Sequence, residues 1–89
     1  MRDLNEIRKD INTIDEQLVK LFVQRMDCAK DVAEYKKANN IPILNESREK
    51  EVLDRVAAKG GEYASYTRTL FEDIMSMSRS LQQELIDEK

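Results

Sequence analysis

Histidine and tryptophan are absent from this chain of 89 residues, which also has one cysteine, one proline and two glycines. Without histidine, and with Cys28 alone, the chain lacks the parts of a nucleophile–histidine triad and of an ordinary zinc site. The two glycines are adjacent, so the spaced glycines of a phosphate-binding loop are missing as well. Any catalysis must therefore work by means other than a triad, a zinc site or a nucleotide-binding loop.

Long apolar runs and an excess of basic charge are also missing. The chain is 40% hydrophobic and 37% charged, which is typical of one small soluble domain covering residues 1–89. The N-terminal stretch MRDLNEIRKD lacks the apolar segment of a signal peptide, and a lone cysteine forms no internal disulfide, so a cytoplasmic location is expected. The net charge of −3 disfavours a nucleic-acid partner, and no segment predicts a membrane contact.

Apolar residues recur every three or four positions, as in amphipathic helices, and no stretch alternates apolar and polar residues as a strand does. The expected fold class is therefore all-α, with a long first helix, a short second helix and a third of medium length. The first should run from Leu4 to about Asn39, and the second from about Glu46 to Lys59. The third should run from about Glu62 to Ile86.

Two short segments should separate these helices. Pro42 disfavours helical geometry in the residue before it, and Asn45 can cap a helix that starts after it, so residues 39–44 should form a connector. Gly60 and Gly61 offer the left-handed residue that commonly closes a helix.

The first helix is too long for a compact monomer. About 35 residues span about 50 Å, whereas a globular chain of this length has a radius of gyration of about 12 Å. The same helix of a second chain can cover its apolar seam along the whole length, which predicts an intertwined two-fold homodimer. The seam comprises Leu4, Ile7, Ile11, Ile14, Leu18, Leu21, Cys28, Val32 and Tyr35. Cys28 is also expected in the core. The third helix carries an apolar stripe that we expect in the core: Tyr63, Tyr66, Leu70, Ile74, Met77, Leu81 and Leu85.

Several charged residues stand where apolar residues are expected. Arg25 is the only charged residue in the seam of the first helix, and Arg8 and Lys36 lie in the adjoining row. Near the start of the second helix, Glu49 lies on the face that should be buried and Arg48 lies at its edge. Burying an unpaired charge costs several kcal/mol, so these residues require partners inside the bundle.

Two neutral polar residues, Ser78 and Gln82, interrupt a largely apolar row of the third helix. Each unusual residue alone has an ordinary explanation: a seam arginine can set the helix register, a flanking cation can face water, and hydroxyl and amide groups can join helices. Glu49 could also simply pair with Arg25. Taken together, however, four cations against one carboxylate leave an excess of positive charge. A small polyanion would balance that charge.

This set of residues resembles the all-helical (AroQ-class) chorismate mutases. The resemblance runs through IRKDINTIDEQLVKLFVQR, AKDVAEYKK, IPILNESREKEV and LFEDIMSMSRSLQQ, and so covers nearly the whole chain. It implies three helices per subunit in an intertwined dimer whose active sites take residues from both chains. It also implies conversion of chorismate to prephenate, on the route to phenylalanine and tyrosine, without metal or cofactor.

The resemblance also implies a role for each residue. Arg8 would reach in from the partner chain, while Arg25 and Arg48 would bind the substrate carboxylates. Lys36 and Gln82 would donate to the ether oxygen that breaks, and Glu49 would accept the ring hydroxyl. The remaining substrate contacts would be Ser78, near a carboxylate, and Asn45, where many relatives carry aspartate.

Two other functions fit parts of the pattern. An isochorismate-pyruvate lyase resembles this fold and uses most of the same cations, and a helical dimerisation module without enzymatic activity could bury the same charges in ion pairs. Arg79 receives no role from the resemblance and is expected at the surface or at the rim of the dimer.

Overall fold

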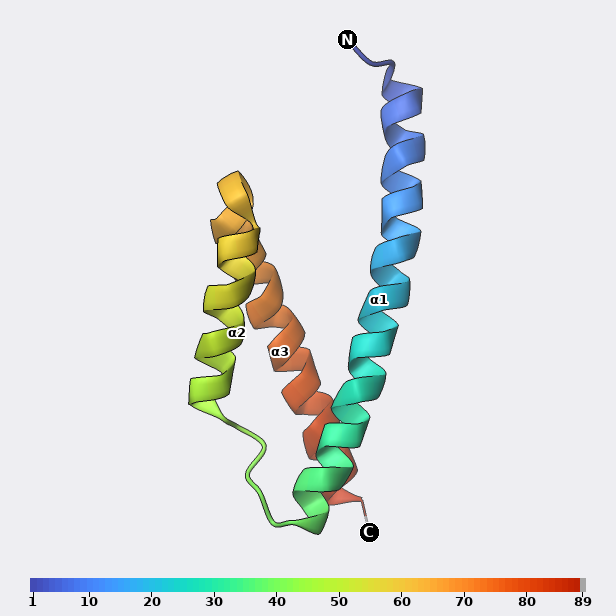
Figure 1. Ribbon diagram of the computed structural model, residues 1–89. Helices are drawn as coiled ribbons and strands as arrows, with labels where there is room; N and C mark the ends of the chain where they lie inside the picture. Colours follow the sequence, from blue (N-terminus) through green and yellow to red (C-terminus); the bar gives the residue numbers. More distant parts are fainter. Residues whose placement is uncertain (89) are drawn as a thin grey trace.

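The computed structural model describes residues 1–88, and within this range it contains helices and no strand. Figure 1 shows α1 (Leu4–Ala38), α2 (Glu46–Lys59) and α3 (Ala64–Asp87), with a single 3₁₀ turn, η1 (Gly61–Tyr63), before α3. The all-α prediction is confirmed. The predicted bounds of α2 are those observed, and the predicted third helix corresponds to η1 followed by α3.

The helix ends follow from local capping. Asn45 accepts a hydrogen bond from the Arg48 backbone N–H (3.1 Å), which satisfies one of the free donors in the first turn of α2. At the other end of α2, Gly60 is the C-cap and Gly61 has φ +58°, the left-handed conformation that glycine adopts without strain. The connector also contains a left-handed residue, Asn40, with φ +54°.

The three helices form an open arrangement with α3 in the middle (Figure 1). α2 packs beside α3, while α1 meets α3 only through its C-terminal part, so that the N-terminal half of α1 projects away from both. Ala29 and Ala33 are the buried residues of α1, and their small side chains let α1 approach α3 closely. The radius of gyration, 16.4 Å, exceeds the value of about 12 Å expected for a compact chain of this length.

The core of the single chain is small and lies between α2 and α3. Val52, Val56 and Met75 are buried in it, and Leu53 and Phe71 pack against them. The apolar seam of α1 remains outside this core, because most of its side chains are exposed. These exposed seam residues are Leu4, Ile11, Ile14, Leu18, Leu21, Val32 and Tyr35.

The prediction of core residues on the third helix is partly wrong for the single chain. Tyr63, Tyr66, Leu70 and Met77 are exposed, whereas Met75 is buried. The row that faces the interior of the subunit is instead Phe71, Met75, Ser78 and Gln82. Cys28, also expected in the core, is exposed.

None of the helices in residues 1–88 is both long enough and apolar enough to cross a membrane.

Candidate active site

A cavity of about 270 Å³ lies where α1, α2, α3 and the connector meet. A cavity of this size suits a small organic ligand. Every predicted site residue except Arg8 lines it. The lining comprises Arg25, Cys28, Ala29, Val32 and Lys36 from α1, Ile43 and Asn45 from the connector, Arg48, Glu49 and Val52 from α2, and Met75, Ser78, Arg79 and Gln82 from α3.

The α1 wall supplies two cations, Arg25 and Lys36. They are eleven residues apart, which is close to three helical turns, so both side chains lie on the same face of α1. The Arg25 guanidinium of α1 lies over the ring of Phe71 of α3, 5.8 Å from its centroid. The Lys36 ammonium donates to the carbonyl oxygen of Ile43 at 2.5 Å and so joins the end of α1 to the connector.

The α2 wall is built on the capped first turn. Asn45 caps that turn and also lines the cavity, so the same residue can both cap α2 and contact a ligand. Arg48 reaches the cavity from the edge of the helix, where its half-exposed guanidinium pairs with Glu51 at 2.9 Å. The neighbouring Glu49 faces inward, and its side chain is 25% exposed.

The α3 wall contributes the most deeply buried polar groups. Ser78 and Gln82 are 8% and 6% exposed, and the Gln82 amide nitrogen donates to the Ser78 hydroxyl at 3.0 Å. Within residues 1–88, the Gln82 amide oxygen is buried without a hydrogen-bond partner. Turning the amide over would let its oxygen accept from the Ser78 hydroxyl and would leave the amide nitrogen as the group without a partner. A ligand oxygen would then complete the hydrogen bonding of this side chain.

Arg79 is the site residue that sequence reasoning missed. It lines the cavity, with its side chain 35% exposed, and donates to the Glu49 carboxylate, so Glu49 pairs with Arg79 and not with Arg25. A signal was present in the sequence, because Arg79 follows Met75 by four positions and precedes Gln82 by three, which places all three on one helical face.

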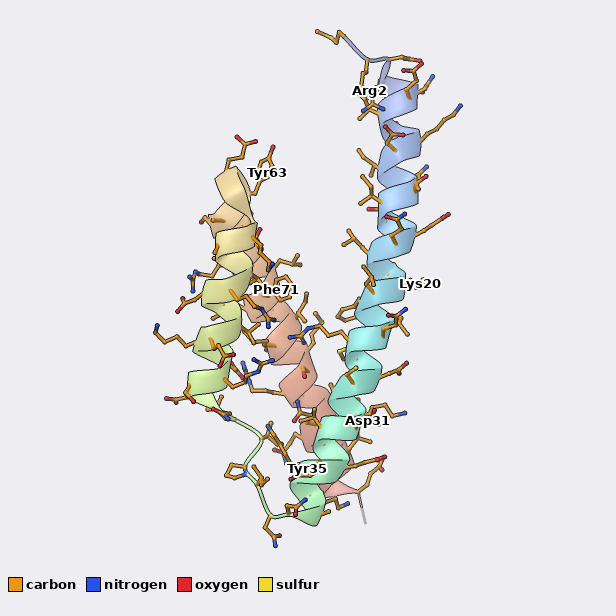
Figure 2. All side chains as sticks on the ribbon, viewed as in Figure 1. Arg2, Lys20, Asp31, Tyr35, Tyr63 and Phe71 are labelled. Atoms are coloured by element: carbon orange, nitrogen blue, oxygen red, sulfur yellow. The ribbon has the colours of Figure 1, made fainter. Side chains whose placement is uncertain are left out.

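Arg8 lies outside this cavity. It is seventeen residues before Arg25 on the same helix, or about 25 Å along the axis. Figure 2 shows the side chains of this N-terminal half of α1 extending without reaching α2 or α3. Arg8 therefore cannot contribute to the cavity of its own chain.

The charge of the cavity determines what it can bind. Arg25, Lys36, Arg48 and Arg79 surround a single carboxylate, Glu49. Guanidinium groups bind carboxylates through paired hydrogen bonds, and the buried amide of Gln82 can donate to a neutral oxygen. The arrangement can hold a small dianion in one conformation and stabilise negative charge that develops on it.

The fold and the cavity thus define a helical protein with a cavity between its helices that is lined by four cations and one carboxylate. The family model described as chorismate mutase type II matches residues 7–83, and the chain belongs to this family. No solved structure gives a significant match.

Named relatives agree with this placement. The chain is 35% identical to a chorismate mutase of Methanocaldococcus jannaschii, in an alignment that covers 96% of this chain and 89% of the relative. It is 38% identical over 56 residues to a bifunctional chorismate mutase/prephenate dehydratase of Aquifex aeolicus, covering 63% of this chain and 16% of that protein. The enzyme of the same description from Escherichia coli K12 is 29% identical, over 92% of this chain and 22% of its own length.

Proposed function

We propose that the protein is an isomerase that rearranges chorismate to prephenate in the biosynthesis of phenylalanine and tyrosine. The observation that carries the proposal is the excess of cations around one carboxylate in a cavity that also contains the buried amide of Gln82. Chorismate has two carboxylates, a ring hydroxyl and an ether oxygen, and each has a complementary group in this cavity. The family membership and the long alignment with the Methanocaldococcus jannaschii enzyme support the same reaction.

The chemistry follows from the charges. In the rearrangement, one carbon–oxygen bond breaks while one carbon–carbon bond forms, and no proton is transferred. Arg25 and Arg48 hold the two carboxylates so that the substrate stays in its compact diaxial conformer, with Asn45 and Ser78 as further contacts. Lys36 and Gln82 donate to the ether oxygen as it gains negative charge. Glu49 accepts the hydrogen bond of the ring hydroxyl.

Binding requires two small rearrangements of the free chain. The Arg48 guanidinium leaves the exposed Glu51, and the Lys36 ammonium leaves the carbonyl of Ile43. The exposed ion pair contributes about 0–1 kcal/mol, and a hydrogen bond from a charged donor contributes about 1.5–3 kcal/mol. A substrate carboxylate can replace the partner of Arg48, and the ether oxygen, as it gains negative charge, can replace the carbonyl that accepts from Lys36.

The proposed active unit is a homodimer in the cytoplasm with two shared sites. The exposed seam of α1 is apolar except at Arg25, and the same helix of a second chain would cover it. Such a pairing would carry Arg8 of the partner subunit toward the cavity that Arg8 cannot reach within its own chain. A single cysteine fits a reducing compartment.

The first test of the function is direct. The purified protein should consume chorismate and form prephenate, measured by the loss of chorismate absorbance, and should form no salicylate from isochorismate. Salicylate formation would favour the lyase.

Chorismate should also raise the melting temperature, because a ligand that binds only the folded state stabilises it. Neither turnover nor a thermal shift would be expected of a dimerisation module.

The dimer should persist on dilution, with no folded monomer detectable. The seam of α1 would otherwise expose its leucine and isoleucine side chains to water, and the core of the single chain is small. Light scattering combined with circular dichroism over a dilution series would measure mass and helicity together. A well-folded species with the mass of one chain would contradict both the dimer and the shared site.

Mixing two inactive variants should restore activity. Arg8→Ala and Arg25→Ala should each lower kcat/KM by about a hundredfold, because each removes one cation from every site. In a mixed dimer, one site combines both wild-type arginines and the other combines both alanines. An equimolar mixture at random pairing should therefore regain about a quarter of the wild-type sites. No recovery after verified subunit exchange would contradict a site built from two chains.

A further inference from the structure

We infer that Arg79 is a positioning residue that holds the Glu49 carboxylate toward the ring hydroxyl of the substrate. In this role it also keeps Glu49 from pairing with the cations that must bind the substrate carboxylates. The inference rests on the proposed function of the cavity. In the proposed mechanism, Arg79 lines the cavity but binds neither substrate carboxylate, so its guanidinium is available for this other role.

The Arg79–Glu49 pair is the most enclosed ion pair in residues 1–88. It joins α3 to α2, its side chains are 35% and 25% exposed, and both residues line the cavity. Each of the other ion pairs in this part of the chain has both side chains at least 41% exposed, the next most enclosed being Arg68–Asp54. Water screens an enclosed pair less, so this pair should fix the carboxylate more firmly than the surface pairs fix theirs.

The other cations of the cavity have partners that a ligand can replace. Arg25 lies over an aromatic ring, Lys36 donates to a backbone carbonyl, and Arg48 pairs with an exposed carboxylate outside the cavity. Arg79 alone binds the carboxylate inside the cavity. The substrate can therefore take over the first three cations, while Arg79 remains with Glu49.

Removing Arg79 should weaken substrate binding through Glu49. The carboxylate would then either turn to Arg25 or Arg48 and withdraw a cation from the substrate, or stay uncompensated and repel the substrate carboxylates. In both cases the carboxylate would no longer be held toward the ring hydroxyl. Losing a group that orients a ligand-binding side chain typically costs about 10-fold to 100-fold in activity.

The test compares Arg79→Met and Arg79→Lys, each in the wild-type and Glu49→Gln backgrounds. We expect Arg79→Met to lower kcat/KM by about 10-fold to 100-fold and Arg79→Lys to recover part of the loss, because lysine keeps the charge without the planar fork. In the Glu49→Gln background, Arg79→Met should change kcat/KM by less than about threefold, since the effects of residues that act as a unit are not additive.

Arg68→Met is the matched control. Arg68 also lies on α3 and also pairs with a carboxylate of α2, Asp54, at 3.1 Å, but it does not line the cavity. Its substitution removes an ion pair between the same two helices and should leave kcat/KM within about twofold of wild type. If Arg68→Met lowered kcat/KM as much as Arg79→Met does, Arg79 would act only by joining α2 and α3.

Binding of unreactive analogues adds a readout that does not depend on turnover. Arg79→Met should raise the dissociation constant of a ring-saturated chorismate analogue that keeps the hydroxyl by about tenfold or more. The analogue lacking the hydroxyl should lose a smaller factor, because only the effect of the released Glu49 carboxylate on the other cations remains. Equal losses for both analogues would mean that Arg79 does not hold Glu49 toward the hydroxyl, and an additive loss in the Glu49→Gln background would mean that Arg79 acts without Glu49; either result would overturn the inference. A wild-type protein that neither turns over chorismate nor binds either analogue would refute the proposed function itself.

Discussion

Replacing Lys36 with alanine should lower kcat by about two to three decades while changing KM much less. The Lys36 ammonium lines the cavity at the end of α1, where it donates to the carbonyl of Ile43 in the free chain and would donate to the ether oxygen in the proposed complex. Charge on the ether oxygen appears only as the bond breaks, and a donor aimed at that oxygen therefore stabilises the transition state more than the bound substrate. Losing one such donor typically costs about 3 kcal/mol.

Lys37 provides the control for this experiment. Its ammonium donates to the carbonyl oxygens of Leu85 and Glu88 at the end of α3, away from the cavity. Lys37→Ala removes the same charge from the adjacent position and should leave kcat within about twofold of wild type. Steady-state kinetics of both variants would show whether Lys36 stabilises the transition state or only binds the ground state. A raised KM with an unchanged kcat for Lys36→Ala would mean that this lysine only binds the ground state.

The helix bounds could be predicted because they depend on local signals. Pro42, the Asn45 cap and the glycine pair act on the backbone within a few residues, whatever the rest of the chain does. The positions of Arg25, Lys36 and Glu49 were predictable for a related reason. A charged residue on an apolar helical face must find a partner, and the faces of α1 and α2 that carry these residues line one cavity.

The packing of α3 was harder to predict, because this helix is apolar on more than one face. Leu70 and Met77 lie on a face that is exposed in the single chain, while Phe71 and Met75 face α2. Helical periodicity identifies apolar rows, but it does not tell which row packs within the subunit and which row is left for a second chain. The same ambiguity hid Arg79: its spacing from Met75 and Gln82 is visible in the sequence, but the burial of Met75 is what shows that this row faces the interior.

The pH dependence of Gln82→Glu is the sharpest test of the mechanism. A neutral amide can donate to the ether oxygen at any ordinary pH, so the activity of the wild-type protein should vary little across neutral pH. A glutamic acid at this position can donate only while protonated. Once ionised, it would repel the negative charge that builds on the oxygen, and the loss at neutral pH should reach about 10³-fold or more. The variant should therefore be active at acid pH and lose activity as pH rises.

The surroundings of Gln82 determine the pH at which the Gln82→Glu variant loses activity, but not the direction of the change. Gln82 is 6% exposed, which favours the neutral acid, while the cations that line the cavity favour the carboxylate. Chorismate turnover from about pH 4.5 to pH 8, with circular dichroism at each pH, would measure the profile on folded protein. The control is Gln83→Glu, which adds the same group on the exposed face of α3, where Gln83 donates to Asp87 at 2.8 Å. Gln83→Glu should follow the wild-type profile. If Gln82→Glu followed it too, Gln82 could not be the donor to the ether oxygen, and Lys36 would have to stabilise that oxygen alone.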